Sequence, residues 1–269
     1  MTNWRDPARI QSDYLSLLKL IHVLGGIYIW EFVTTCNFEL EVLRRRRPYR
    51  WTIWVYLCVR ISTLIAFSFM FVDIGPWTSE SCRIGDIITF AFSYLSVASA
   101  SLIIVIRTAV LWNYNRAAVA LSVGIWAVST ALNIRDLTLV EAYYDPQADI
   151  CMQISTNRSQ ANAVGILVSD LVLLGTMLAG LHRHYDAKDG FFGLWRLLFR
   201  QGVIWLFLAT IAEVPSVVMI YLDLSDPWNI MFPPAALLIL AIAATRMHRE
   251  LSEYGSITTF QSVDILFIP

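Results

Sequence analysis

The chain has 269 residues, of which 57% are hydrophobic and 15% are charged, and its formal net charge is −1. Soluble domains carry roughly 25% charged residues, so the composition excludes an ordinary soluble globular protein. The net charge near zero excludes a general electrostatic attraction to nucleic acid. We therefore expect lipid to surround much of the molecule.

Seven apolar stretches follow one another along the chain, at residues 15–37, 51–74, 86–112, 117–137, 161–181, 194–222 and 229–246. A helix that crosses a bilayer needs about 20 mostly apolar residues. The first stretch is longer than the apolar core of a signal peptide, so we interpret it as a retained helix. The sequence predicts an all-α, polytopic membrane protein with one domain, a seven-transmembrane-helix bundle at 15–246, between an N-terminal segment at 1–14 and a tail at 247–269.

The positions of Lys and Arg between these stretches predict the orientation, because cytosolic loops carry an excess of both residues. Twelve lie on one side of the bundle and four on the other: Arg44, Arg45, Arg46, Arg47, Arg50, Arg116, Arg183, Lys188, Arg196, Arg200, Arg246 and Arg249 against Arg5, Arg9, Arg83 and Arg158. We therefore expect the N-terminus outside and the C-terminus in the cytosol. The expected location is the plasma membrane or another membrane of the secretory pathway.

Two further features fall on the predicted outer side. Cys82 precedes the third stretch and Cys151 lies in the long connection 138–160, so both would face an oxidising compartment. We expect a disulfide between them, and the alternative is two free thiols. The only N-glycosylation sequon is Asn157-Arg158-Ser159, which makes Asn157 the predicted glycosylation site.

Glu31 and Arg60 each lie in the inner half of an apolar stretch. A charge at the centre of a bilayer costs about 2.5–3.5 kcal/mol on insertion scales, so each of them needs a partner. Because neighbouring stretches run antiparallel, the two residues reach a similar depth, and we expect an intramembrane ion pair. Its simplest role is to clamp two helices together; the alternative is one half of a switch that breaks on activation.

Four polar residues, His22, Arg135, Asp170 and Glu213, lie in the outer halves of their stretches. Together they would line a pocket that opens outward beneath the bridged loop and receives a small-molecule ligand. Two carboxylates at one depth in a low dielectric require a shared proton, a cation or an arginine. The alternative is a structural Arg135–Asp170 pair beside a solvated or protonated Glu213.

Pro215 and Arg107 are the two positions at which the sequence suggests a conformational change. Pro215 lies within the sixth stretch, two residues after Glu213, where proline removes a backbone hydrogen bond and kinks a helix. Such a kink either pivots or is a static packing feature.

The third stretch is rich in serine and alanine, which predicts a central, closely packed helix. Arg107 ends this stretch on the inner side, where G-protein-coupled receptors carry a basic residue, and is a candidate switch. The Asp-Arg-Tyr pattern of those receptors is absent.

Three histidines, His182, His184 and His248, lie at predicted cytosolic helix ends and could together hold zinc in a membrane hydrolase. His182 and His184 are two residues apart, which places them on different faces of a helix. The chain contains no phosphate-binding glycine loop, no G-x-S-x-G and no H-E-x-x-H. We predict that the protein is not an enzyme and has no catalytic residue, cofactor or metal; a solvated basic edge is the simpler interpretation.

A basic run lies in the first predicted cytosolic loop and consists of Arg44, Arg45, Arg46 and Arg47. Such runs fix topology and attract anionic lipid. Membrane lipids, including anionic ones at this run, are therefore the expected partners. A sorting signal or a protein partner is the alternative.

Several short motifs occur together along the chain: Glu31-Phe32, Glu39-Leu40-Glu41 with the basic run and Arg50-Trp51, Cys82-Arg83, Ile106-Arg107-Thr108-Ala109-Val110-Leu111-Trp112, and Phe199-Arg200-Gln201-Gly202-Val203. This set resembles a large group of basidiomycete multi-pass membrane proteins that carry an N-terminal domain of unknown function. The resemblance covers most of the chain after residue 14 and implies a fungal seven-helix membrane protein. It assigns no activity and no catalytic residue.

These features favour a receptor-like seven-helix sensor of an extracellular or membrane ligand, which would act on a cytosolic signalling partner. The alternative is a small transporter or lipid-handling protein in which Asp170 and Glu213 serve as proton or cation sites. Both hypotheses rest on analogy at the level of the fold.

Overall fold

Helices dominate the computed structural model, which describes residues 7–44, 51–71, 79–145, 150–154, 156–185, 192–223 and 225–265. The helices are α1 (Pro7–Leu43), α2 (Thr52–Phe71), α3 (Ser79–Leu111), α4 (Arg116–Thr138), α5 (Gln160–Tyr185), α6 (Phe192–Leu222), α7 (Asp226–Ile230) and α8 (Pro233–Ile265). Each predicted apolar stretch corresponds to one helix, except that the seventh is divided between the short α7 and the long α8.

Among the described residues, six helices are long and apolar enough to cross a membrane, namely α1 to α5 and the α7–α8 segment. In α6, Phe207–Leu222 forms a shorter apolar helix. Many large apolar side chains point outward from these helices, including Trp30 at 73% exposure and Ile134 at 63%. A helical membrane bundle explains this surface, because in lipid an exposed apolar side chain carries no hydration cost.

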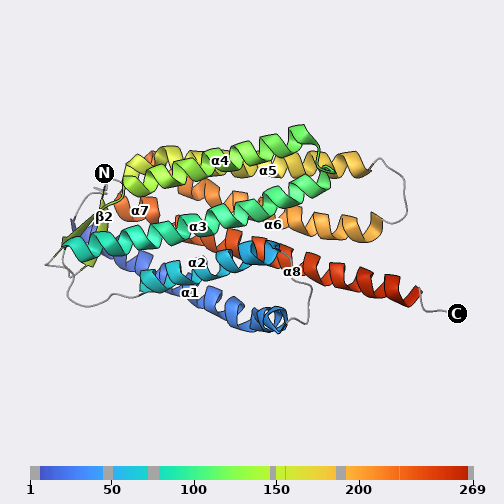
Figure 1. The fold of residues 1–269 in the computed structure, drawn as a ribbon. Coiled ribbons are helices and arrows are strands. Elements are labelled where there is room, and N and C mark those ends of the chain that lie inside the picture. Colours follow the sequence, from blue (N-terminus) through green and yellow to red (C-terminus); the bar gives the residue numbers. More distant parts are fainter. Residues whose placement is uncertain are drawn as a thin grey trace.

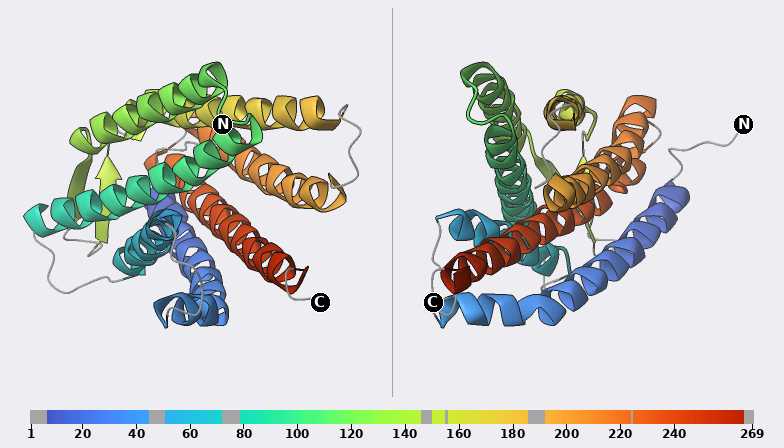
Figure 2. Two further views of the ribbon diagram at one scale, coloured as in Figure 1. Left: turned by 45° about the vertical axis from the view of Figure 1, so that its right-hand side comes forward. Right: turned by 90° about the vertical axis from the view of Figure 1, so that its right-hand side faces the viewer.

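The long helices lie side by side as a bundle (Figure 1). Consecutive helices pack against each other, and α8 packs against both α6 and α1, which closes the bundle into a ring. The predicted central position of the third helix is confirmed, because α3 contacts α2, α4, α5 and α8. By contrast, α1 lies along the outer edge of the bundle (Figure 2, right).

Small side chains bring α2 and α3 together, as the serine-rich sequence predicts. The hydroxyls of Thr63 and Ser96 lie 2.6 Å apart. The Ser99 hydroxyl donates to the Cys58 sulfur at 3.3 Å, and Ala100 is fully buried. These contacts satisfy polar groups inside the bundle without a charge.

The long connection after α4 forms an antiparallel hairpin that the sequence reading did not anticipate. Strand β1 (Glu141–Asp145) pairs with β2 (Ile150–Ile154), with Tyr144 opposite Cys151, and a 3-10 turn, η1 (Thr156–Ser159), leads into α5. The predicted disulfide between Cys82 and Cys151 is confirmed and ties the hairpin to the start of α3. The Tyr14 hydroxyl of α1 also donates to the Cys151 carbonyl at 2.7 Å. The hairpin is thus fixed to two helices at one end of the bundle.

Prolines and the tail define the course of the last helix. Pro233 and Pro234 begin α8, where the first turn tolerates residues without an N–H. The predicted tail after residue 246 continues α8, which runs to Ile265. Pro215 lies inside α6 as predicted. The sequon residue Asn157 lies in η1, and its glycosylation stays a prediction.

Replacing Cys151 by serine should lower the thermal stability of the detergent-solubilised protein. The disulfide closes a loop of 69 residues, and loops of this length contribute about 4 kcal/mol in the chain-entropy description. Tryptophan fluorescence during heating would measure the change. The matched control is Cys36→Ser, because Cys36 is a free thiol. Equal melting temperatures for both variants would contradict a stabilising disulfide.

Candidate functional site

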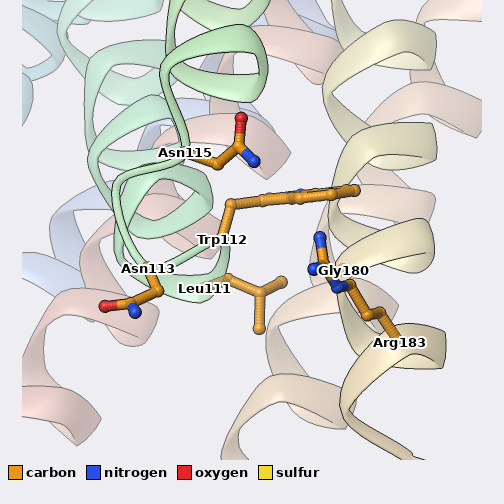
Figure 3. A pocket seen from close by; sticks show the side chains of 6 residues that line it. All are labelled: Leu111, Trp112, Asn113, Asn115, Gly180 and Arg183. Atoms are coloured by element: carbon orange, nitrogen blue, oxygen red, sulfur yellow. The ribbon is translucent and has the colours of Figure 1, made fainter.

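A cavity of about 340 Å³ opens beside the turn that joins α3 to α4. Its lining comes from this turn and from α5: Leu111, Trp112, Asn113, Asn115, Gly180 and Arg183 (Figure 3). The cavity lies at the end of the bundle away from the hairpin. None of the four residues predicted to form an outer pocket lines it.

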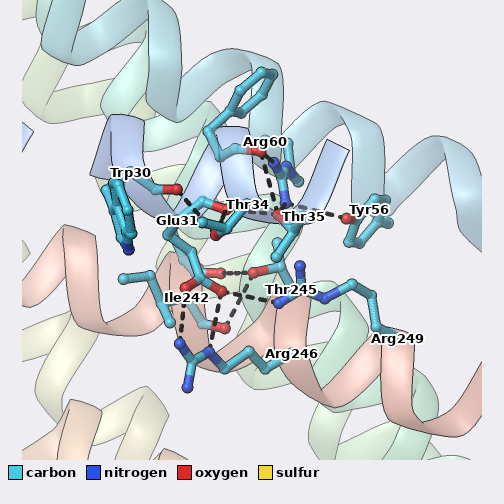
Figure 4. Close-up of polar contacts among 12 residues, drawn as sticks. Trp30, Glu31, Thr34, Thr35, Tyr56, Arg60, Ile242, Thr245, Arg246 and Arg249 are labelled. Atoms are coloured by element: carbon cyan, nitrogen blue, oxygen red, sulfur yellow. Dashed lines mark hydrogen bonds and ion pairs between the residues drawn. The ribbon is translucent and has the colours of Figure 1, made fainter. Parts of the chain in front are cut away.

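A cluster of ionised side chains joins α1 to α8 (Figure 4). It lies farther along α1 than Tyr14, which contacts the hairpin, and so in the half of the bundle that holds the cavity. Glu31 of α1 accepts from Arg246 Nη2 at 2.7 Å and from Arg249 Nη2 at 2.9 Å. Its carboxylate is 13% exposed, and Arg249 is 12% exposed whereas Arg246 is 40% exposed. Both arginines lie on α8, three residues apart, so they occupy one face of that helix. We call Glu31, Arg246 and Arg249 the ion cluster.

Arg60 of α2 has a different set of partners on α1. Its Nε lies 2.8 Å from Glu39 Oε1, and its Nη2 donates to the Phe32 carbonyl at 2.9 Å. Its guanidinium also lies over the Phe32 ring, 4.4 Å from the centroid, and donates to the Thr35 hydroxyl. At 2% exposure, Arg60 is thus buried with nearly all of its polar edge in contact with α1.

The predicted Glu31–Arg60 pair is wrong, although the requirement for partners was right. Glu31, Thr35 and Glu39 follow each other at intervals of four residues, which places them along one side of α1. Arg60 contacts this side of α1 at Glu39, whereas Glu31 pairs with the two arginines of α8. Depth alone could not distinguish the two carboxylates, because two helical turns separate them by only about 12 Å. The sequence reading missed Glu39, Arg246 and Arg249 as partners.

His248 of α8 extends this region toward α2. Its ring stacks on Tyr56 with 5.0 Å between centroids, and its Nε2 lies 3.3 Å from the Thr52 hydroxyl. His182 is exposed on α5. Within the described ranges, no three His, Cys, Asp or Glu residues come together as a candidate metal site. The contacts of His248 are those of a packed aromatic side chain.

Asp170 of α5 and Glu213 of α6 face each other inside the bundle. They are 1% and 6% exposed, and the two carboxyl groups interact electrostatically. Two buried carboxyl groups this close cannot both stay charged at low cost, so one of them takes a proton or both face a cation. Asp170 Oδ2 and Glu213 Oε2 have no hydrogen-bond partner among the described residues. This pair is the one part of the predicted outer pocket that the structure brings together.

His22 and Arg135 do not join Asp170 and Glu213. His22 is exposed on α1, where its Nδ1 contacts the Leu18 carbonyl at 2.7 Å and its ring contacts Phe71. Arg135 is exposed on α4, and no ion pair links it to Asp170 among the described residues. The predicted four-residue pocket is therefore wrong. The prediction used only the depth of each residue in the membrane. Residues at the same depth can nevertheless point to different sides of their helices, depending on their rotation about the helix axis.

Asp136, the neighbour of Arg135, takes the buried position instead. It is 4% exposed and accepts hydrogen bonds from the Tyr94 hydroxyl of α3, from Ser159 at 2.8 Å and from Asn162 of α5 at 3.3 Å. The carboxylate thus joins α3, α4, η1 and α5 at the hairpin end. Asp136 lies at the end of an apolar stretch, where an acidic residue is expected to belong to the neighbouring loop. Its buried position was therefore not predicted from the sequence.

Arg107, the predicted inner-end switch, is 8% exposed and lies in the electrostatic field of Glu250 on α8. Its Nη2 has no hydrogen-bond partner among the described residues. Arg44 is exposed just after α1. Arg45, Arg46 and Arg47 lie outside the described residues, so the predicted lipid contact of the basic run stays a prediction.

Comparison with known proteins adds no family to this picture. No protein-family model matches the chain, and no curated protein matches it either.

Replacing Glu31 by glutamine should destabilise the protein by about 3 kcal/mol, because removal of one partner leaves buried charge without compensation. Arg249→Gln should cost more than Arg246→Gln, since Arg249 is 12% exposed and Arg246 is 40% exposed. The control is Glu141→Gln, which breaks the exposed pair with Arg158 and should cost less than about 1 kcal/mol. Thermal unfolding of the variants in one detergent measures all four. An equal effect of Glu31→Gln and Glu141→Gln would contradict the cluster's role.

Proposed function

We propose that this protein is a receptor-like membrane sensor that responds to an extracellular or membrane ligand and acts on a cytosolic partner. The observation that carries the proposal is the ion cluster, which joins the first and last helices of the ring in the half away from the hairpin. A disulfide and hydrogen bonds fix the hairpin end. The molecule therefore combines one covalently fixed end with one end held by breakable ionic contacts.

Breaking the ion cluster would release α8 from α1. Since α8 also packs against α6 and α3, its release changes the packing of the helices around Arg107. Ion pairs that exchange partners are a common basis of two-state switches, because both states then satisfy the charges. The proposed switch therefore consists of Glu31 with Arg246 and Arg249, in place of the Glu31–Arg60 pair that the sequence predicted.

The topology, location and origin belong to the same proposal. The N-terminus is outside, the cavity and the ion cluster face the cytosol, and the chain is a member of the fungal group that its motifs resemble. The distribution of basic residues and the hairpin disulfide support this orientation. Glycosylation of Asn157 on the hairpin side would agree with it.

Weakening the cluster should populate a second conformation of α6. Spin labels on cysteines at Tyr114 and Ile204, which are both exposed, report the distance between the α3–α4 turn and α6 in nanodiscs. Cys36 and Cys58 are replaced by serine first. We expect one main distance in the parent protein and a second population in Glu31→Gln, with the ratio shifted about tenfold.

The control for this experiment is Arg158→Gln at the hairpin end, which should leave the distance distribution unchanged. A single unchanged distance in Glu31→Gln, in protein that still folds, would contradict a switch at the ion cluster.

A second function, proton or cation transport, is favoured by one specific observation. Asp170 and Glu213 form a buried carboxyl pair, and each keeps one oxygen without a partner among the described residues. Intramembrane carboxyl pairs of this kind hold protons or cations in transporters. In this alternative the pair is the exchange site, and Pro215, two residues beyond Glu213, lets α6 bend.

Proton flux in liposomes decides between the two functions. If transport is the function, liposomes with the protein and an internal pH-sensitive dye dissipate an imposed pH gradient faster than empty liposomes, and Glu213→Gln abolishes the difference. Glu141→Gln in the exposed hairpin is the matched control and retains the flux. Flux equal to that of empty liposomes would remove proton transport by this pair as the function.

A further inference from the structure

The cavity at the α3–α4 turn contains a guanidinium held against an indole ring. Arg183 of α5 lies below the Trp112 ring, with 5.7 Å between its Cζ and the ring centroid (Figure 3). The Trp112 Nε1 donates to the Thr176 carbonyl at 3.0 Å, which fixes the ring against α5. A guanidinium beside an aromatic face keeps its in-plane N–H donors available for a second partner.

Gly180 leaves the space in which this arrangement fits. A Cβ at position 180 would lie 2.7 Å from a methyl group of Leu111 and 2.9 Å from Trp112 Nε1. Contacts this short require a neighbour to move. Glycine at 180 therefore lets the indole lie close to the backbone of α5, one turn before Arg183.

The lining selects an anion. Arg183 is the only charged residue of the six, and no carboxylate pairs with it within the described ranges. Asn115 uses its Oδ1 to cap α4, accepting from the Ala117 N–H at 3.0 Å, and its side chain lies across the Trp112 ring from Arg183 (Figure 3). The planar fork of the arginine matches the geometry of a phosphate group.

The surroundings favour a phosphate attached to acyl chains. On α5 an exposed stripe leads toward Arg183 through Leu171, Gly175, Leu178 and Ala179. Apolar side chains along this stripe, such as Leu171 at 50% and Leu178 at 45% exposure, provide a surface for a lipid tail. Tryptophan and arginine at a helix end are also the residues expected at the level of the headgroups.

We propose that this cavity binds the phosphate of an anionic phospholipid, with Arg183 as the ligand and Trp112 as the support for the guanidinium. The site is separate from the basic run at Arg44–Arg47 and does not depend on the proposed sensor function. Binding there would hold the α3–α4 turn to the end of α5.

The experiment uses the purified full chain, stripped of lipid in detergent, and native mass spectrometry with three probes: dioctanoyl phosphatidylglycerol, dioctanoyl phosphatidylcholine and inorganic phosphate. We expect the protein to bind phosphatidylglycerol more tightly than phosphatidylcholine. Arg183→Gln should weaken phosphatidylglycerol binding about tenfold, which corresponds to about 1.4 kcal/mol. Arg158→Gln at the opposite end is the matched control and should leave the affinity unchanged.

A conservative variant keeps the test decisive if Arg183→Gln does not fold. Arg183→Lys keeps the charge but loses the planar fork, so its affinity should fall between that of the parent protein and that of the glutamine variant. Equal affinities for the two lipids, or parent-like affinity in both Arg183 variants, would overturn the site. Displacement of phosphatidylglycerol by an equal concentration of inorganic phosphate would overturn the assignment to a lipid.

Discussion

The cost of an ion in hydrocarbon is the constraint on which the arrangement of this bundle depends. Glu31 and Arg60 lie inside apolar stretches of α1 and α2, and each pairs with an opposite charge on another helix. Unpaired, the two groups would cost about 5–7 kcal/mol by insertion scales, a large fraction of the stability of a whole domain. The contacts therefore define which faces of α1, α2 and α8 meet. Because α8 is the last helix and α1 the first, satisfying Glu31 also closes the ring.

The two ends of the molecule meet the same constraint by different means. At the hairpin end, Asp136 receives hydrogen bonds from three neutral donors, and the Cys82–Cys151 bond fixes the hairpin covalently. At the other end, the contacts are ionic and one member, Arg246, is 40% exposed. Ionic contacts near water break and form again at a smaller cost than a covalent bond, since water can solvate the separated partners. This asymmetry gives the bundle a rigid end and an end that can change its packing.

The sequence specified the helices well, because each apolar stretch leaves its backbone only one way to satisfy its hydrogen bonds in lipid. It also specified the disulfide, since only Cys82 and Cys151 fall on the side that the basic residues predict to be outside. It failed where the answer depends on rotation about a helix axis. Arg135 and Asp136 are adjacent, yet only Asp136 is buried, and Glu31 was matched to Arg60 by depth when Glu39 faces Arg60 more directly. The hairpin was missed because its strands are five residues long, although Tyr143 and Tyr144 followed by Pro146 are residues typical of a strand and a turn.

Helix α6 lies between the two helices that carry the arginine sites described above. It packs between α5 and α8; α5 contributes Arg183 and Asp170, and α8 contributes Arg246 and Arg249. Glu213 and Pro215 lie on α6 between these neighbours, and the buried Glu213 carboxyl group faces Asp170 of α5. A change at either arginine site reaches α6 through the helix that carries the site. Since α6 packs against both α5 and α8, a shift of either helix must be accommodated by α6, and Pro215 removes one backbone hydrogen bond from its interior.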